Sequence, residues 1–269
     1  VFCTNGEIME RIAVFGGVYN NHLSLKALVQ DAEARGATEF YCLGDMGGFG
    51  PSPDLVFPYL RDDPRMFVMQ GNYDHSIGNR LEDCACGYTD PQDNHFAQIS
   101  YNYTFENTSE ENKAWLRTLP RSYRFSLGPL KVLLCHGSPR KTNEFLWEST
   151  SPDHLLSSFC KDHEANLICC SHTGIKWHRV LPQKQHFFNV GVIGRPENSG
   201  QTNVWFLLIE YMNGKLNFNF CPLEYDHDRL AREMIQEKLP EEFIATVQTG
   251  WWTTCMEIMP AKERLRGQF

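Results

Sequence analysis

The chain has 269 residues, of which 42% are hydrophobic, and this is enough to bury one large core or at most two small ones. Its formal net charge of −8 at pH 7 repels phosphate polymers, which argues against nucleic acids and anionic membrane surfaces as partners. No apolar run approaches the roughly 18 residues of a membrane span, and the first residues lack a signal-peptide pattern, so we expect a cytoplasmic protein.

The first seventy residues alternate between strand and helix patterns. Short apolar runs predict strands at residues 11–15, 39–43 and 65–70, and apolar residues at helical spacing predict helices at 23–34 and 53–61. Such an order requires crossover connections and a largely parallel sheet. Ligands of these sheets gather beyond the carboxyl ends of the strands, so the turns that follow the strands are the places to look for a site.

The rest of the chain is richer in strands. A polar stretch at residues 74–93 predicts a long binding loop or lid, and residues 109–119 predict a helix. Further strands are predicted at 122–127, 130–135, 167–170, 186–190, 204–211 and 215–221, and helices at 226–238 and 241–248. We find no internal repeat or linker and expect a single domain over residues 1–269, with 222–269 as a C-terminal helical extension.

Four polar side chains directly follow predicted strands. Asp45 comes after Gly44, Asn72 after Gly71, and the remaining two follow the runs VLLC (His136) and LICCS (His172). One carboxylate, one amide and two imidazoles form a mixed oxygen and nitrogen set that suits Zn, Mn or Fe. Any one of these residues alone is more simply a turn residue or a buried histidine, but their recurrence at four strand ends favours a metal site.

These motifs resemble the calcineurin-like metallophosphoesterase superfamily, in particular its small bacterial phosphodiesterase-like branch. The matching stretches are IAVFGGVYNNHLSL, LGDMGGFGPSP, GNYD, LLCHGSP, SHTGIKW and NVGVIGRP, and they cover roughly residues 11–210 in the order of the family. The resemblance implies an α/β fold, a four-layer αββα sandwich of two mixed sheets flanked by helices. It also implies a two-metal site at one edge of the sheets.

Carried over residue by residue, the resemblance gives a complete second metal site and a degraded first one. The second metal would be held by Asp45, which bridges both metals in the family, and by Asn72, His136 and His172. The first would need an aspartate and a histidine where this chain has Gly17 and Tyr19, and a histidine where it has Gly174. Glycine has no ligating side chain, so we expect a single divalent metal.

A tyrosine replaces the family's acid–base histidine. The family motif GNHD is here GNYD, with Tyr73 in the histidine position. A tyrosine with a reference pKa near 10 is a weak acid at neutral pH, so we expect Tyr73 to orient the substrate or to donate a hydrogen bond.

Further candidate residues lie in the loops that follow these motifs. Arg140 and Arg195 are candidates for binding an anionic group of the substrate, although solvated loop charges are an equally good interpretation. The Cys84-Ala85-Cys86 stretch is a weak candidate for further metal ligands, and a reduced pair or a local disulfide is the better interpretation.

The sequence therefore favours a metal-dependent hydrolase acting on a small phosphoester, with Asp45 and Tyr73 in catalytic roles. Two other hypotheses stay open, a mononuclear metalloenzyme with a non-phosphoryl reaction and a non-catalytic binding or regulatory protein that keeps the fold. The expected partner is a small anionic substrate. The sequence leaves the oligomeric state open, a homo-oligomer included.

Overall fold

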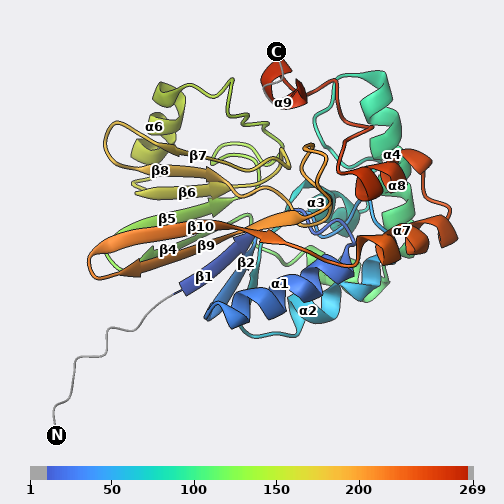
Figure 1. The fold of residues 1–269 in the computed structure, drawn as a ribbon, viewed down its shortest axis with the longest axis horizontal. Helices are drawn as coiled ribbons and strands as arrows, with labels where there is room; N and C mark the ends of the chain where they lie inside the picture. Colours follow the sequence, from blue (N-terminus) through green and yellow to red (C-terminus); the bar gives the residue numbers. More distant parts are fainter. Residues whose placement is uncertain (1–10, 266–269) are drawn as a thin grey trace, which may run out of the picture.

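A computed structural model describes residues 11–265, which form two five-stranded sheets packed face to face (Figure 1). The first sheet has the order β10-β9-β1-β2-β3, in which β1, β2 and β3 are parallel and β9 and β10 run antiparallel to their neighbours. Its strands are β1 (Arg11–Phe15), β2 (Glu39–Cys42), β3 (Met66–Val68), β9 (Val204–Met212) and β10 (Lys215–Leu223).

The second sheet has the order β4-β5-β6-β8-β7 and is also mixed. Strands β5, β6 and β8 are parallel, while β4 and β7 are antiparallel to the strands beside them. The strands are β4 (Ser122–Leu127), β5 (Leu130–Cys135), β6 (Leu167–Cys170), β7 (Trp177–Val180) and β8 (His186–Asn189). The parallel strands of each sheet therefore have a common carboxyl edge.

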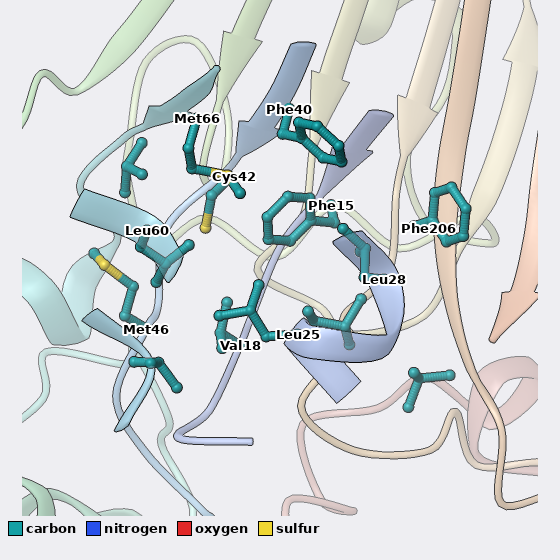
Figure 2. Packing of buried hydrophobic residues seen from close by; sticks show 14 of the residues in the cluster. Phe15, Val18, Leu25, Leu28, Phe40, Cys42, Met46, Leu60, Met66 and Phe206 are labelled. Atoms are coloured by element: carbon teal, nitrogen blue, oxygen red, sulfur yellow. The ribbon is translucent and has the colours of Figure 1, made fainter. Parts of the chain in front are cut away.

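Alternation along the central strands supplies the core on both faces of the first sheet. In β1, Ile12 and Val14 belong to the cluster between the sheets, and Ala13 and Phe15 belong to the cluster on the opposite face. Figure 2 shows Phe15 beside Leu28 of α1 in that second cluster. Because successive side chains of a strand point to opposite faces, a strand covered on both sides reads as a continuous apolar run.

Helices cover the outer faces of both sheets. Helices α1 (His22–Ala34) and α2 (Phe57–Arg61), with the short 3-10 helix η1 (Pro53–Leu55), lie against the first sheet, and α6 (Asp153–Asp162) lies against the second (Figure 1). The result is helix, sheet, sheet, helix. The predicted four-layer α/β sandwich is thus confirmed.

Four further helices gather at one end of the two sheets (Figure 1). They are α3 (Asn72–Asn79), α4 (Pro91–Asn107), α7 (His227–Gln236) and α8 (Glu241–Thr249). Two short helices complete the described part of the chain, α5 (Glu110–Leu116) and α9 (Ala261–Leu265). The prediction of one long loop at 74–93 is wrong, because α3 occupies its beginning and α4 its end. Asp90, whose side chain accepts from two backbone N–H groups, and Pro91 at the first helical position were the available signals for α4.

Over the described residues, no helix is both long and apolar enough to cross a membrane.

Candidate metal centre

The structure brings the predicted ligands together at the carboxyl edges of the two sheets. Asp45 follows β2, Asn72 opens α3 just after β3, His136 follows β5 and His172 follows β6. One ligating atom from each of Asp45, His136 and His172 lies within 4.8 Å of the other two, and all four side chains are buried. Both sheets therefore contribute to one group of donors.

The backbone at Asp45 is held in an unusual conformation. Asp45 has a φ of 58°, in the left-handed region that non-glycine residues rarely adopt. The Asp74 carboxylate accepts from the N–H groups of Asp45 (2.7 Å), Met46 (3.0 Å) and Gly71 (2.8 Å), which fixes the two turns to each other. A Cβ on Gly71 would lie 2.2 Å from Asp45 Oδ1, so this close approach requires a glycine.

Backbone carbonyls determine which nitrogen of each histidine is available. Nδ1 of His136 lies 2.6 Å from the Leu43 carbonyl, and Nε2 of His172 lies 3.2 Å from the Cys86 carbonyl. A carbonyl oxygen can only accept, so these nitrogens carry the protons. The other nitrogens, His136 Nε2 and His172 Nδ1, lie 3.2 Å apart, and His136 Nε2 is also 3.2 Å from Asp45 Oδ2.

Asn72 is the fourth candidate ligand, and its side-chain oxygen has no hydrogen-bond donor within the described residues. Its amide nitrogen donates to the Cys84 carbonyl at 2.9 Å and lies 3.5 Å from Cys86 Sγ. Its Oδ1 is buried, and no donor in the described part of the chain reaches it. Buried polar atoms normally have a partner. An orphaned amide oxygen beside a carboxylate and two imidazole nitrogens fits a divalent cation.

The three groups shift one another's pKa values. Burial raises the pKa of Asp45, but the charge and hydrogen bond of His136 outweigh burial and hold this pKa below its usual range. Burial lowers the pKa of His136, whereas Asp45 raises it above its usual value. Burial and the charge of His136 together lower the pKa of His172 to about 3. Asp45 is thus ionised and His172 neutral at neutral pH, as metal ligands must be, whereas Asp45 favours a proton on His136 that a bound metal would displace.

Tyr73 contacts this group through its backbone. Its N–H donates to Asp45 Oδ1 at 3.0 Å. Its hydroxyl lies 3.1 Å from Ser100 Oγ and 3.3 Å from the Ala97 carbonyl, both on α4. Burial raises the pKa of this hydroxyl further above its already high ordinary value, so it is no acid at neutral pH.

The structure separates the two arginines. Arg195 is 7% exposed and lines a cavity of about 50 Å³, here called the inner cavity, whose walls include Tyr19, Asp45, Asn72 and His172. Arg140 is exposed and pairs with Glu144. It lines a second hollow of about 330 Å³, the outer pocket, with Asn72, His75, Arg121 and Lys141. Asn72 is common to both.

The positions of the degraded first site are filled by packing. Gly17 has a φ of +50°, and a Cβ there would lie 2.3 Å from Val192 Cγ1. Gly174 has a φ of +78°, and a Cβ there would lie 3.1 Å from Trp252. The Tyr19 side chain lies in the wall of the inner cavity. Larger side chains at Gly17 and Gly174 would therefore collide with their neighbours.

Sequence reasoning missed how two segments contribute to the site. The stretch Cys84-Ala85-Cys86 closes into a local disulfide, one of the interpretations that the sequence favoured, but the sequence did not indicate that its carbonyls are the partners of Asn72 and His172. Trp252 and Cys255, from outside the matching motifs, also reach this region, Cys255 in the wall of the inner cavity and Trp252 against Arg195. No local pattern in the sequence indicates either contribution.

Comparisons with known proteins agree with the fold of this chain. A metallophosphoesterase from Sphaerobacter thermophilus superimposes with a TM-score of 0.69, covering 90% of this chain and 99% of its own at 20% identity. The chain has the metallophosphoesterase fold. A hypothetical protein from Pyrococcus horikoshii OT3 superimposes on this metallophosphoesterase-like chain with a TM-score of 0.73, at 19% identity, covering 91% of this chain and 100% of its own.

A curated relative is similar in sequence as well. An uncharacterized protein of Methanocaldococcus jannaschii is 24% identical over 249 residues, which are 87% of this chain and 96% of the relative. No family model matches the chain. The metallophosphoesterase fold, together with the buried group of Asp45, His136 and His172, makes this edge of the sheets the candidate site for a divalent metal.

Proposed function

We propose that this protein is a metal-dependent hydrolase of a small phosphoester and works with one divalent transition metal, Zn, Mn or Fe. Asp45, Asn72, His136 and His172 would hold the metal. The observation that carries the proposal is Asn72 Oδ1, which is buried without a donor in the described part of the chain, while Asn72 lines the same cavity as Asp45 and His172. Leaving such an oxygen unsatisfied costs about 1–3 kcal/mol, and a bound cation would remove this cost.

A bound divalent metal would supply Lewis-acid chemistry, acidifying a water and neutralising phosphoryl oxygens. The chain supplies the orientation. The Leu43 and Cys86 carbonyls fix the two imidazole rings, and the Tyr73 N–H fixes the Asp45 carboxylate. In this proposal Tyr73 is a positioning residue through its backbone.

Arg140 and Arg195 would act on different parts of the substrate. Arg195 is buried in the wall of the inner cavity and would contact the group that reacts. Arg140, in the outer pocket with Arg121 and Lys141, would attract the anionic substrate on its approach. This local positive charge contrasts with the net charge of −8 of the chain.

Metal analysis and a substrate panel test the proposal together. The metal-free protein should take up about one equivalent of Zn²⁺ or Mn²⁺ per chain, measured by titration calorimetry and elemental analysis. His136→Ala should weaken metal binding at least about 100-fold, since even residues that only orient ligands are worth 10–100-fold. His178→Ala serves as the matched control, because His178 packs on Phe188 and Phe218 away from the group.

Turnover then separates the hypotheses. The loaded protein should hydrolyse an aryl phosphomonoester or phosphodiester, and Asp45→Ala should abolish this activity. One metal equivalent without phosphoester turnover would favour the non-phosphoryl metalloenzyme. No metal uptake would contradict the proposal and favour a binding protein that keeps the fold.

A further inference from the structure

Side chains at Gly17 and Gly174, the positions that the family resemblance assigns to ligands of a first metal, would collide with aliphatic and aromatic neighbours. A Cβ on Gly17 would collide with Val192 and would also lie 2.9 Å from Tyr19 Cζ, and a Cβ on Gly174 would press on the Trp252 ring. Overpacking of this kind costs about 1–3 kcal/mol. This side of the site has been rebuilt around Tyr19 and Trp252.

Arg195 lies among these same rings. Its guanidinium carbon is 3.5 Å from the centre of the Trp252 ring and 5.8 Å from that of Tyr19. Trp252 is itself fixed, because its indole N–H donates to the Pro196 carbonyl and its backbone N–H to Asn198 Oδ1. A guanidinium stacked on a fixed ring has its planar edge held in one orientation.

Arg195 has no direct carboxylate partner among the groups that act on it most strongly in the described part of the chain. These groups are the Cys255 thiol, which also hydrogen-bonds to it, and the hydroxyls of Tyr19 and Tyr88. The carboxylate of Asp45 lines the same cavity. Nε of Arg195 is buried and has no hydrogen-bond partner within the described residues. A buried cation is costly unless it is paired, so the arginine favours an anion in the cavity whose wall it forms.

The inner cavity has the size for a compact anion. Its volume is about 50 Å³, and a single water needs about 10–15 Å³ on the same scale, so a group of several heavy atoms fits. Asp45, Asn72 and His172 line the same cavity as Arg195. An anion in this cavity would lie beside Arg195 and the candidate metal ligands Asp45, Asn72 and His172.

We propose that Arg195 takes over the charge of the missing first metal, and that the inner cavity is a subsite for a tetrahedral oxyanion, the phosphoryl group of the substrate. This inference rests on the proposed function and assigns a further catalytic residue to it. A guanidinium supplies two N–H donors to phosphoryl oxygens and a fixed positive charge, but it cannot acidify a water. The metal held by Asp45, Asn72, His136 and His172 would therefore still be needed to activate the water.

Inorganic phosphate is the probe that tests the subsite. Binding is measured by calorimetry on the metal-loaded protein and, separately, on the metal-free protein. Arg195→Met should weaken phosphate binding about 10- to 100-fold, the expected worth of hydrogen bonds to a charged group, and Arg195→Lys should recover part of the loss. Metal stoichiometry should stay at that of the wild type in both variants, because Arg195 is no ligand.

Arg65→Met is the matched control. Arg65 is half-exposed and pairs with Glu33 and Asp63 beside β3, outside both pockets, so its loss should change phosphate affinity by less than about twofold. Equal phosphate affinity in the wild type and in folded Arg195→Met would overturn the subsite. If the wild type takes up no metal, the proposed function fails, but a loss of phosphate binding in metal-free Arg195→Met would still support the subsite.

A second measurement keeps the inference testable should Arg195→Met fail to fold. A crystal structure of the wild type with orthovanadate should show the anion within hydrogen-bond distance of Arg195 Nε. Vanadate bound elsewhere, with the inner cavity empty, would contradict the assignment.

Discussion

At the scale of single residues, Gly17 and Gly174 occupy positions at which the family resemblance places ligands of the first metal. Gly17 and Gly174 both have positive φ angles, and their missing side chains make room for Val192 and Trp252. A side chain at either position would strain the backbone, because φ is positive, and would also collide with neighbouring side chains. Replacing Gly17 and Gly174 by ligands would thus disturb packing before it could provide a metal site.

Gly17→Ala should lower the free energy of unfolding by about 2–5 kcal/mol, the sum of the costs of a left-handed alanine and of a steric collision. Urea denaturation measures this. Gly214→Ala is the control, because Gly214 has a φ of +75° but nothing within 4 Å of its would-be Cβ, so only about 1–2 kcal/mol is expected. Equal losses in the two variants would show that the space around Gly17 is free.

At the scale of elements, the site depends on turns at strand ends and on one short disulfide loop. The Cys84–Cys86 loop lies in the connection between α3 and α4 and contacts two candidate ligands, Asn72 and His172. Within the described residues, we find no other segment outside the strand-end turns that does so. The carbonyls of the loop orient the Asn72 amide and the His172 ring. Groups that orient metal ligands are worth 10–100-fold in affinity.

Cys84→Ser combined with Cys86→Ser should weaken Zn²⁺ or Mn²⁺ binding by about 10-fold, because the loop then holds Asn72 and His172 less firmly. Competition with a chromophoric chelator measures the affinity. Cys160→Ser, on α6, removes a cysteine outside the site and should leave the affinity as in the wild type. Unchanged affinity in the double variant would assign the disulfide a role other than ligand positioning.

At the scale of the whole molecule, a histidine pair between the two sheets should make the free energy of unfolding depend on pH. His178 of β7 lies 3.0 Å from His186 and packs on Phe188 of the same sheet and on Phe218 of the other. Burial and the charge of His186 lower the pKa of His178 to about 4. Protonation there would place a charge where the sheets meet.

The sign of the effect follows from the two pKa values. Above about pH 6.5, His178 is neutral in both the folded and the unfolded state, so it does not change the free energy of unfolding. Between about pH 6.5 and 4, His178 takes up a proton only in the unfolded chain. The free energy of unfolding should therefore fall as the pH drops through this range. For a half-buried group we expect a loss on the order of 1 kcal/mol between pH 7 and 5.

His178→Phe should reduce this loss while keeping the contact with Phe188. Urea denaturation of wild type and variant at pH 7 and pH 5 measures the difference. His154→Gln, at an exposed position of α6, controls for the removal of a histidine as such. A variant with the full pH dependence of the wild type would rule out His178 as its source.

The strand-end pattern of the sequence by itself determined the four candidate ligands, and the resemblance to the metallophosphoesterase superfamily predicted the two mixed sheets. Asp45, Asn72, His136 and His172 each directly follow an apolar strand, and the carboxyl ends of parallel strands share an edge, so local pattern and topology place these residues together. Helices α4 and α6 escaped prediction, since α4 in particular is polar along much of its length and its signal lay in its cap at Asp90.

Only the tertiary structure decided what surrounds the ligands. It separated Arg195 from Arg140, turned the Tyr73 hydroxyl toward α4, and brought Trp252 from the C-terminal segment onto Arg195. These contacts join residues far apart in the chain, and no periodicity or motif spacing records them. The physical reason is that a strand-end turn is specified locally, whereas the walls of a cavity are specified by packing between distant elements.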